Sequence, residues 1–385
     1  MKNRTNAILL LSGILLLIVP SFLNTAHSQD RDRFIPGEIW PDNNGVHINA
    51  HGGGFLHHEG TYYWFGEHKT DGSGGNRANV GVHVYSSEDL YNWTDEGIAL
   101  AVETDTTSEV RAGSVIERPK VIYNPETEQF VMWFHLELYG QGYRAARTAL
   151  AVSDHVTGPY EYIRSLRPHA GVWPENFTEE QKQADYDEER MDEDREYRRR
   201  AIEEGVFTIR DFEGGQMSRD MTLFVDDDGT AYHITSTEEN YTLMISELDE
   251  TYTDFTGRWI RVFPGGHNEA PAIFKKDGIY YLIMSGATGW TPNAARSAMA
   301  EDMFGPWTFL GNPARGSEEQ MSSTFESQST FILPVEGIED AFIFMGDRWR
   351  PQNAIDGRYV WLPIEFEDGR PVIRWYEEWD LSVFE

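Results

Sequence analysis

Three acidic residues stand at the start of strand-like segments in separate parts of the chain: Glu117, Asp220 and Glu269. When such strands are arranged around one axis, side chains at the same end of each strand converge on a shared centre. Two carboxyl groups that flank a sugar linkage supply the acid and the base that cleave it. The three acids therefore predict an acid–base site for glycoside chemistry, although a single acid before a strand usually only caps that strand.

The elements that would position these acids repeat along the chain. Most of the repeated segments follow a turn signal such as Asp226-Asp-Asp-Gly229 or Lys276-Asp-Gly278, and Asp-Gly tolerates the positive φ that tight hairpin turns demand. The five aromatic-rich segments are residues 62–67, 131–137, 231–238, 280–285 and 342–347. Five hairpin units of about fifty residues predict an all-β, five-bladed β-propeller, with an irregular β-sandwich as the alternative.

One segment, residues 174–205, breaks this pattern. It is dense in charge and carries helix formers, as in Arg195-Glu-Tyr-Arg-Arg-Arg200. We interpret it as a charged helical insertion between the second and third blades. Most such helices only cover a surface, and the functional alternative is a lid or wall beside the site.

The N-terminal residues 1–28 have the composition of a cleavable signal peptide. Lys2 and Arg4 precede an apolar run, and Ala26-His-Ser28 supplies small residues before Gln29. The apolar run is short for a membrane span, so an anchoring helix is the weaker reading. With no Cys, the chain has neither disulfides nor a lipid-modified cysteine. We expect a periplasmic or secreted protein, with no membrane anchor after cleavage and one catalytic domain over residues 29–385.

The charge balance narrows the range of partners. The chain has 64 acidic and 32 basic residues, a formal charge of −32. Such a surface repels nucleic-acid phosphates and anionic lipids, so neither is expected to bind. No sequence pattern demands a cofactor or a metal, and Asp226-Asp-Asp-Gly229 lacks the spacing of a calcium loop. The oligomeric state is open.

Four motifs carry a resemblance to a known family. They are Glu117-Arg-Pro-Lys120, Ser218-Arg-Asp-Met221, Asn268-Glu-Ala-Pro271 and Ser285-Gly-Ala-Thr-Gly-Trp290. On these motifs the chain resembles glycoside hydrolase family 43 over essentially its whole mature length. The resemblance implies a five-bladed propeller that inverts the anomeric centre, with Glu269 as general acid and Asp220 as the residue that tunes it. A structural calcium ion, present in some members of the family, is not indicated by the residues here.

The family's usual base, an Asp in the first blade, has no counterpart. The matching segment is Val46-His-Ile-Asn-Ala-His-Gly-Gly-Gly54, without a carboxylate. This departure resembles the exo-β-1,3-galactanase-like branch, which implies that Glu117 and Gln328 handle the attacking water. An amide is a poor base, so Gln328 would need an imidic tautomer to accept the proton. The plainer hypothesis makes Glu117 the base, directly or through one water that Gln328 holds. The structural alternative is that Gln328 is a buried amide whose only role is to form hydrogen bonds at the ends of neighbouring strands.

Further side chains are candidates for binding sugar. Glutamates end several of the repeated segments, tryptophans offer flat faces for a pyranose ring, and glycines flank a histidine that can approach a ligand closely. The candidates are His51, Glu67, Arg118, Glu137, Glu238, Trp290, Asn293, Asp347 and Trp349. Core packing or ion pairing competes with ligand contact at each of them.

Together these observations predict a secreted, inverting exo-glycoside hydrolase whose partner is an oligo- or polysaccharide. The resemblance implies galactose release from β-1,3-galactan or arabinogalactan-type glycans. A β-xylosidase or an α-L-arabinofuranosidase of the same family is the alternative, because pocket depth is not visible in a sequence. A catalytically inactive sugar-binding propeller is the alternative from another class, favoured only by the missing first-blade Asp.

Overall fold

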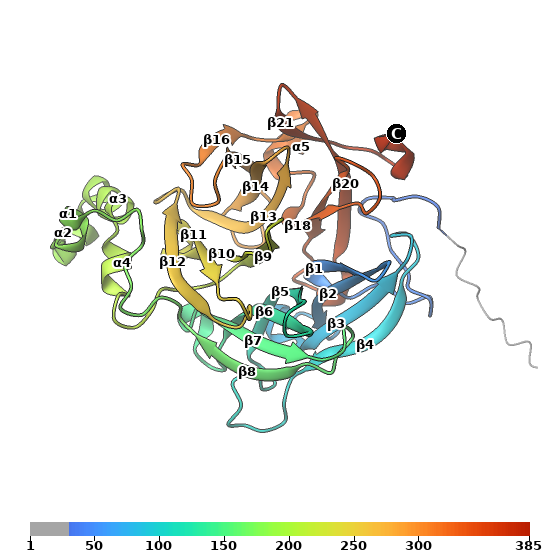
Figure 1. The fold of residues 1–385 in the computed structure, drawn as a ribbon, viewed down its shortest axis with the longest axis horizontal. Coiled ribbons are helices and arrows are strands. Elements are labelled where there is room, and N and C mark those ends of the chain that lie inside the picture. Colours follow the sequence, from blue (N-terminus) through green and yellow to red (C-terminus); the bar gives the residue numbers. More distant parts are fainter. Residues whose placement is uncertain (1–30) are drawn as a thin grey trace, which may run out of the picture.

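The computed structural model describes residues 31–385, which form a ring of five β-sheets around a central axis (Figure 1). The predicted all-β, five-bladed propeller is confirmed. The predicted signal peptide, residues 1–28, lies outside the described residues.

Each blade is a run of hairpins in chain order. Blade 1 contains β1 (His51–His58), β2 (Thr61–Lys69), β3 (Asn79–Ser87) and β4 (Thr94–Ala101). Blade 2 contains β5 (Val115–Asn124), β6 (Gln129–Glu137), β7 (Arg147–Ser153) and β8 (Glu161–Leu166). Blade 3 contains β9 (Met221–Val225), β10 (Ala231–Thr237), β11 (Thr242–Leu248) and β12 (Phe255–Val262).

The last two blades complete the ring. Blade 4 contains β13 (Asn268–Lys276), β14 (Ile279–Gly286), β15 (Arg296–Ala300) and β16 (Thr308–Gly311). Blade 5 contains β17 (Ala314–Arg315), β18 (Gln328–Pro334), β19 (Phe342–Arg348), β20 (Arg358–Glu367) and β21 (Arg370–Arg374), and α5 (Glu318–Ser323) lies before β18. Short 3-10 turns are η1 (Gly75–Arg77), η2 (Gly142–Arg144), η3 (Glu238–Asn240), η4 (Ala354–Asp356) and η5 (Leu381–Phe384).

The repeated aromatic segments are the second strands of the five blades, β2, β6, β10, β14 and β19. Each pairs with an inner strand, and the inner strands β1, β5, β9, β13 and β18 contact one another in a closed circle. Because each blade packs between two neighbouring blades, apolar residues are buried on both faces of these strands; in β6, Met132 and Phe134 pack with blade 1, and Val131 and Trp133 with blade 3. This explains why these segments are nearly continuous hydrophobic runs.

The predicted insertion between blades 2 and 3 forms a helical lobe outside the ring, between β8 and β9 (Figure 1). It consists of α1 (Glu179–Lys182), α2 (Glu188–Glu193), α3 (Arg195–Glu204) and α4 (Val206–Arg210). Asp194 caps α3 by accepting hydrogen bonds from two backbone N–H groups, and Gly205 ends it in the left-handed conformation. No helix of the described residues is long and apolar enough to cross a membrane.

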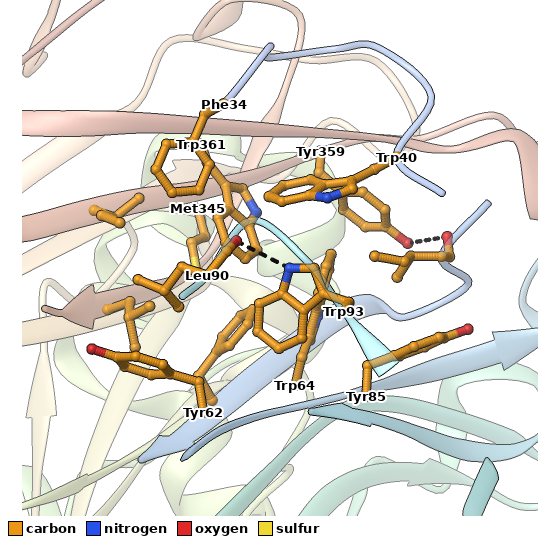
Figure 2. Packing of buried hydrophobic residues seen from close by; sticks show 14 of the residues in the cluster. Phe34, Trp40, Tyr62, Trp64, Tyr85, Leu90, Trp93, Met345, Tyr359 and Trp361 are labelled. Atoms are coloured by element: carbon orange, nitrogen blue, oxygen red, sulfur yellow. Dashed lines mark hydrogen bonds between the residues drawn. The ribbon is translucent and has the colours of Figure 1, made fainter. Parts of the chain in front are cut away.

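The ring closes between blades 1 and 5 through an aromatic core rather than an exchanged strand (Figure 2). Trp64 of β2, Trp93 and Trp361 of β20 pack there with Phe34 and Trp40 from the N-terminal segment. Phe34 also forms a backbone bridge with Trp379, so the N-terminal and C-terminal segments of the described chain both pack at the junction of blades 1 and 5. Burial of such large rings contributes much of the stability at this closure.

Candidate active site

A pocket of about 280 Å³ opens where the inner strands begin, and all five blades contribute to it. It contains the three predicted acids, one each from blades 2, 3 and 4, and the side-chain amide of Gln328 from blade 5. The lining residues are Glu67, Asn76, Glu117, Arg118, His135, Tyr143, Arg219, Asp220, Asn240, Glu269, Gly289, Trp290, Gln328 and Trp349. The convergence predicted from the sequence for Glu117, Asp220, Glu269 and Gln328 therefore occurs in the fold.

A β-bulge follows two of these acids, Glu117 and Glu269, directly in the strand. The register of the inner hairpin shifts after His51 in β1, after Glu117 in β5, after Glu269 in β13 and after Ser329 in β18. In the first three the next residue has a positive φ: 60° at Gly52, 56° at Arg118 and 52° at Ala270. A bulge bends the strand and redirects the preceding side chain. Left-handed backbone at non-glycine residues costs energy that the surrounding fold must supply, as is common at functional sites.

Glu269 lies in a largely dehydrated corner next to blade 3. Asn240 Nδ2 donates to Glu269 Oε1 at 2.5 Å, and the N–H of Ala270 donates to Asp220 Oδ2 at 3.2 Å. Burial and the nearby negative charge of Asp220 raise the pKa of Glu269 to about 7. A carboxyl group with this pKa retains its proton near neutrality and can donate it.

Glu117 lies in a different electrostatic environment. His135 Nδ1 lies 2.9 Å from Glu117 Oε2, and the Tyr143 hydroxyl donates to Glu117 Oε1 at 2.7 Å. Burial alone would raise the pKa of Glu117, but His135, Lys69 and Tyr143 outweigh it and lower the pKa to about 2. His135 also lies 3.1 Å from Glu137, and the two carboxylates raise the pKa of His135 to about 9 against its burial. Glu117 is thus a permanent carboxylate held by an imidazolium.

Arg118 connects the two halves of the pocket. Its Nη2 donates to Asp220 Oδ2 at 2.9 Å and to Gln328 Oε1 at 2.6 Å, while its backbone N–H donates to Glu67 Oε1 at 3.0 Å. The guanidinium also lies 5.3 Å from the ring centre of Trp349. A planar, always charged fork suits this bridging of several acceptors, so Arg118 orients the site.

Gln328 is held from three directions. Its Oε1 accepts from Arg118 and, at 3.0 Å, from Trp349 Nε1, while its Nε2 donates to Ser285 Oγ at 2.9 Å. Arginine and tryptophan N–H groups are donors only, which fixes the orientation of the amide. An imidic tautomer would carry a proton on Oε1 facing these two donors. The geometry therefore favours Gln328 as an orienting amide rather than as a proton acceptor.

An adjoining pocket of about 200 Å³ extends the site between blades 4 and 5. Trp290 and Trp349 line both pockets with their rings 5.8 Å apart, and Trp290 is 43% exposed. Asn293 and Asp347 also line the extension, but their side chains are engaged, Asn293 with the backbone of Gly286 and Asp347 with the Gly52 N–H. The two tryptophans thus provide the exposed apolar faces expected of sugar-binding residues.

Two other residues predicted to contact sugar, Glu67 and His51, lie at different depths. Glu67 lines the main pocket and lies 2.8 Å from Lys69. His51 is buried behind the site and stacks on Tyr359 at 5.1 Å, so it supports the pocket rather than lining it.

Glu137 and Glu238, also predicted as sugar ligands, are not among the residues that line either pocket. Glu137 accepts from the Ala146 N–H at 2.9 Å and lies beside His135. Glu238 is fully buried, accepts from Arg261 at 2.6 and 2.9 Å and from Thr242 at 2.6 Å, and also binds Thr208 of α4. Both carboxylates are engaged in internal interactions that hold neighbouring elements in place.

Several site residues were not predicted: Asn76, His135, Tyr143, Arg219 and Asn240. His135 faces Glu117 across the β5–β6 hairpin. Counting residues back from the turn predicts this pairing only if the position of the bulge is known. Arg219 was visible in the motif Ser218-Arg-Asp-Met221 and donates to the Tyr143 carbonyl at 2.7 Å. Tyr143 and Asn240 lie in the short 3-10 turns η2 and η3, which have no sequence signal of their own.

One group of side chains has the spacing of a metal site. Ligand atoms of Glu117, His135 and Asp220 lie within 4.8 Å of one another. His135 is held between two carboxylates, and Asp220 is paired with Arg118. A cation bound here would have to displace both partners, so the cluster fits acid–base chemistry better than metal ligation.

Five blades around a pocket with a protonated and an ionised carboxyl group define a propeller glycoside hydrolase. A sequence model of glycosyl hydrolases family 43 matches residues 205–369. Comparison with curated proteins found no match. Solved structures, in contrast, match over nearly the whole described chain.

A family 43 β-1,3-galactosidase bound to galactodeoxynojirimycin is 52% identical, with 90% of this chain and 100% of that chain covered and a TM-score of 0.87. A second family 43 β-1,3-galactosidase is 38% identical, with 92% and 65% covered and a TM-score of 0.76. An exo-β-1,3-galactanase from Clostridium thermocellum is 34% identical, with 90% and 66% covered and a TM-score of 0.72. The chain belongs to glycoside hydrolase family 43.

Proposed function

We propose that this enzyme releases terminal galactose from β-1,3-galactan or arabinogalactan-type glycans by inverting hydrolysis. The similarity to β-1,3-galactosidases and an exo-β-1,3-galactanase supports this substrate class. The observation that carries the mechanism is the opposite tuning of Glu269 and Glu117 across one pocket. Export through the predicted signal peptide, and activity without a cofactor, are part of the proposal.

Glu269 is the proposed general acid. It donates its proton to the glycosidic oxygen as the bond to the anomeric carbon breaks, so the leaving sugar departs as a neutral alcohol. Asp220 keeps that proton in place through its negative charge, and Asn240 fixes the carboxyl group. After each turnover, Glu269 must recover a proton from solvent.

Glu117 is the proposed base. It takes the proton of a water that attacks the anomeric carbon from the face opposite the leaving group, which inverts the configuration. A carboxylate with a pKa near 2 is a weak base, so positioning of the water and stabilisation of developing positive charge at the sugar must carry much of its effect. One Nε2 hydrogen of Gln328 bonds Ser285, and we propose that the other orients the water or a sugar hydroxyl.

Product release by the mature chain tests this function. The panel contains β-1,3-galactobiose, de-branched arabinogalactan, xylobiose and an arabinofuranoside, and NMR follows the anomer formed first. Galactose as the sole product, appearing first as the α-anomer, is the expected result. Pentose release would instead identify a β-xylosidase or α-L-arabinofuranosidase. No product from any substrate, with galactobiose binding intact by calorimetry, would identify an inactive sugar-binding propeller.

A further inference from the structure

A second cleft, about 290 Å³ in volume, lies between the helical insertion and the loops that precede Glu269. Its wall on the insertion side is one face of α3, because Arg195, Arg198, Arg199 and Ile202 follow one another at helical spacings of three, one and three residues. The opposite wall contains Tyr241, Gly265 and His267. This face of the helix thus presents three guanidinium groups to a hollow, while Ala201 and Ile202 are the buried apolar residues of α3.

This cationic face is unusual in a protein with a formal charge of −32. Arg195 is the first residue of α3, where the helix dipole disfavours a positive charge, and no carboxylate among the described side chains pairs with it. Arg198 has only a loose partner, Asp192 at 3.9 Å, whereas Arg199 pairs closely with Glu203. The placement of Arg195 therefore does not serve helix stability, and the positive charge of Arg195 and Arg198 is available to an anion.

The helix face is held rigidly against the propeller. Arg261 of β12 donates to the carbonyl oxygens of Ile202 at 2.9 Å and Glu203 at 3.2 Å, which anchors the C-terminal end of α3. Arg261 is itself fixed by Glu238, whose other contacts reach α4. The buried Glu238–Arg261 pair thus positions the cleft as a preformed site.

The cleft lies on the general-acid side of the catalytic pocket. Tyr241 follows Asn240, the residue that donates to Glu269, and His267 precedes Glu269 by two residues, at most about 7 Å along the backbone. A general acid protonates the departing oxygen, so the leaving-group sugars extend on its side. The rings of Tyr241 and His267 pack 4.0 Å apart and form the wall of the cleft that faces the arginines.

We propose that this cleft binds an anionic saccharide unit, carrying a carboxylate or a sulfate, in the leaving-group part of the substrate. Arginine recognises either group through paired N–H donors, and the tyrosine ring offers a face to the sugar. The proposal rests on the proposed function, because it uses Glu269 as the acid. It narrows the substrate class from neutral galactan to galactan chains bearing acidic sugars near the cleavage point.

Matched substrates test the cleft. The enzyme is assayed on a β-1,3-galacto-oligosaccharide and on two derivatives that carry either a uronic acid or a sulfate on the leaving-group side. The test variant is the double substitution Arg195→Gln/Arg198→Gln. Arg200→Gln is the control, because Arg200 lies on the same helix but does not line the cleft. Each assay is repeated at about 1 M NaCl, where the Debye length falls to about 3 Å.

The ratio of kcat/KM for the acidic over the neutral substrate is the readout. We expect the double variant to lower this ratio about tenfold at low salt, as for the loss of charge-assisted hydrogen bonds, while Arg200→Gln leaves it unchanged and high salt removes the difference. The derivative that loses more preference identifies the anion as carboxylate or sulfate. An equal ratio in wild type and double variant would overturn the cleft proposal alone, whereas absence of galactose release from every substrate would overturn the proposed function.

Discussion

Glu117 in blade 2 and Glu269 in blade 4 occupy the same place in two repeats of one architecture, yet their carboxyl groups are tuned in opposite directions. Each precedes a bulge in an inner strand, and each is followed by a residue with positive φ. The pKa of Glu117 is lowered to about 2, whereas that of Glu269 is raised to about 7. The backbone of the two blades aims the carboxyl groups, and it does not decide their protonation.

The residue across the hairpin is one source of the difference. Glu117 pairs with His135 of β6, and Glu269 pairs with Ser285 of β14. An imidazolium stabilises the carboxylate opposite it, while a neutral hydroxyl does not, and blade 4 additionally receives the negative charge of Asp220. The facing residue of the second strand, together with Lys69 and Tyr143 at Glu117 and with burial and Asp220 at Glu269, thus makes the same bulge a site for a base or for an acid.

The largest effect should follow from removing the acid. We expect Glu269→Gln to lower kcat/KM on β-1,3-galactobiose about 10³-fold, because an amide cannot protonate the leaving oxygen. Affinity for galactobiose, measured by calorimetry, should remain. An aryl galactoside with an acidic leaving group serves as the control, since its departure needs little protonation and its hydrolysis should fall much less. An equal loss on both substrates would remove Glu269 from the acid role.

A smaller effect should separate the two candidates for activating water. We expect Glu117→Gln to lower kcat about 10²-fold, and Gln328→Glu to lower it about tenfold or less. Gln328→Glu retains acceptors for Arg118 and Trp349, so it tests the amide without emptying the site. Circular dichroism and thermal unfolding establish that both variants fold. If Gln328→Glu were the more damaging change, the amide and not the carboxylate would be the base.

Much of the architecture was predictable because repeated segments with Asp-Gly turns encode hairpins directly. The family motifs likewise placed Glu117, Asp220 and Glu269 at the beginning of inner strands. The bulges were not predictable, since Arg118 and Ala270 are ordinary residues in a conformation that they rarely adopt. Unless the position of the bulge is known, counting residues back from the turn does not pair Glu117 with His135.

The placement of the predicted sugar ligands shows the same limit. Glu67, Glu137 and Glu238 all end repeated aromatic segments, yet only Glu67 lines the pocket. At Glu238 the chain turns with a φ of 51°, which directs the carboxylate toward Arg261 and the insertion. The three glutamates therefore share a position at the end of a strand, but their side chains point in different directions. Ion pairs with residues distant in sequence determine these directions.

The smallest expected effect, and the sharpest test of the comparison, is a pair of opposed shifts in the pH profile. The free enzyme needs Glu269 protonated, so kcat/KM should be constant well below pH 7 and fall as pH rises through the pKa of about 7. Asp220→Asn removes the like charge, which lowers this pKa and moves the alkaline limb to lower pH by about 1 unit. Asn240→Ala removes a donor that stabilises the carboxylate, so the limb should move to higher pH by a smaller amount.

Shifts of the alkaline limb in opposite directions distinguish a change in the pKa of Glu269 from a general loss of activity. Either substitution lowers the rate if the site is disturbed, but disturbance alone does not move two limbs in opposite directions. Glu326→Gln is the control, because Glu326 lines the extension, is 64% exposed and does not contribute to the pKa of Glu269. Its limb should coincide with that of the wild type. Limbs that move the same way in Asp220→Asn and Asn240→Ala would mean that another group sets the alkaline pKa, and the pairing of acid and base across blades 2 and 4 would fail.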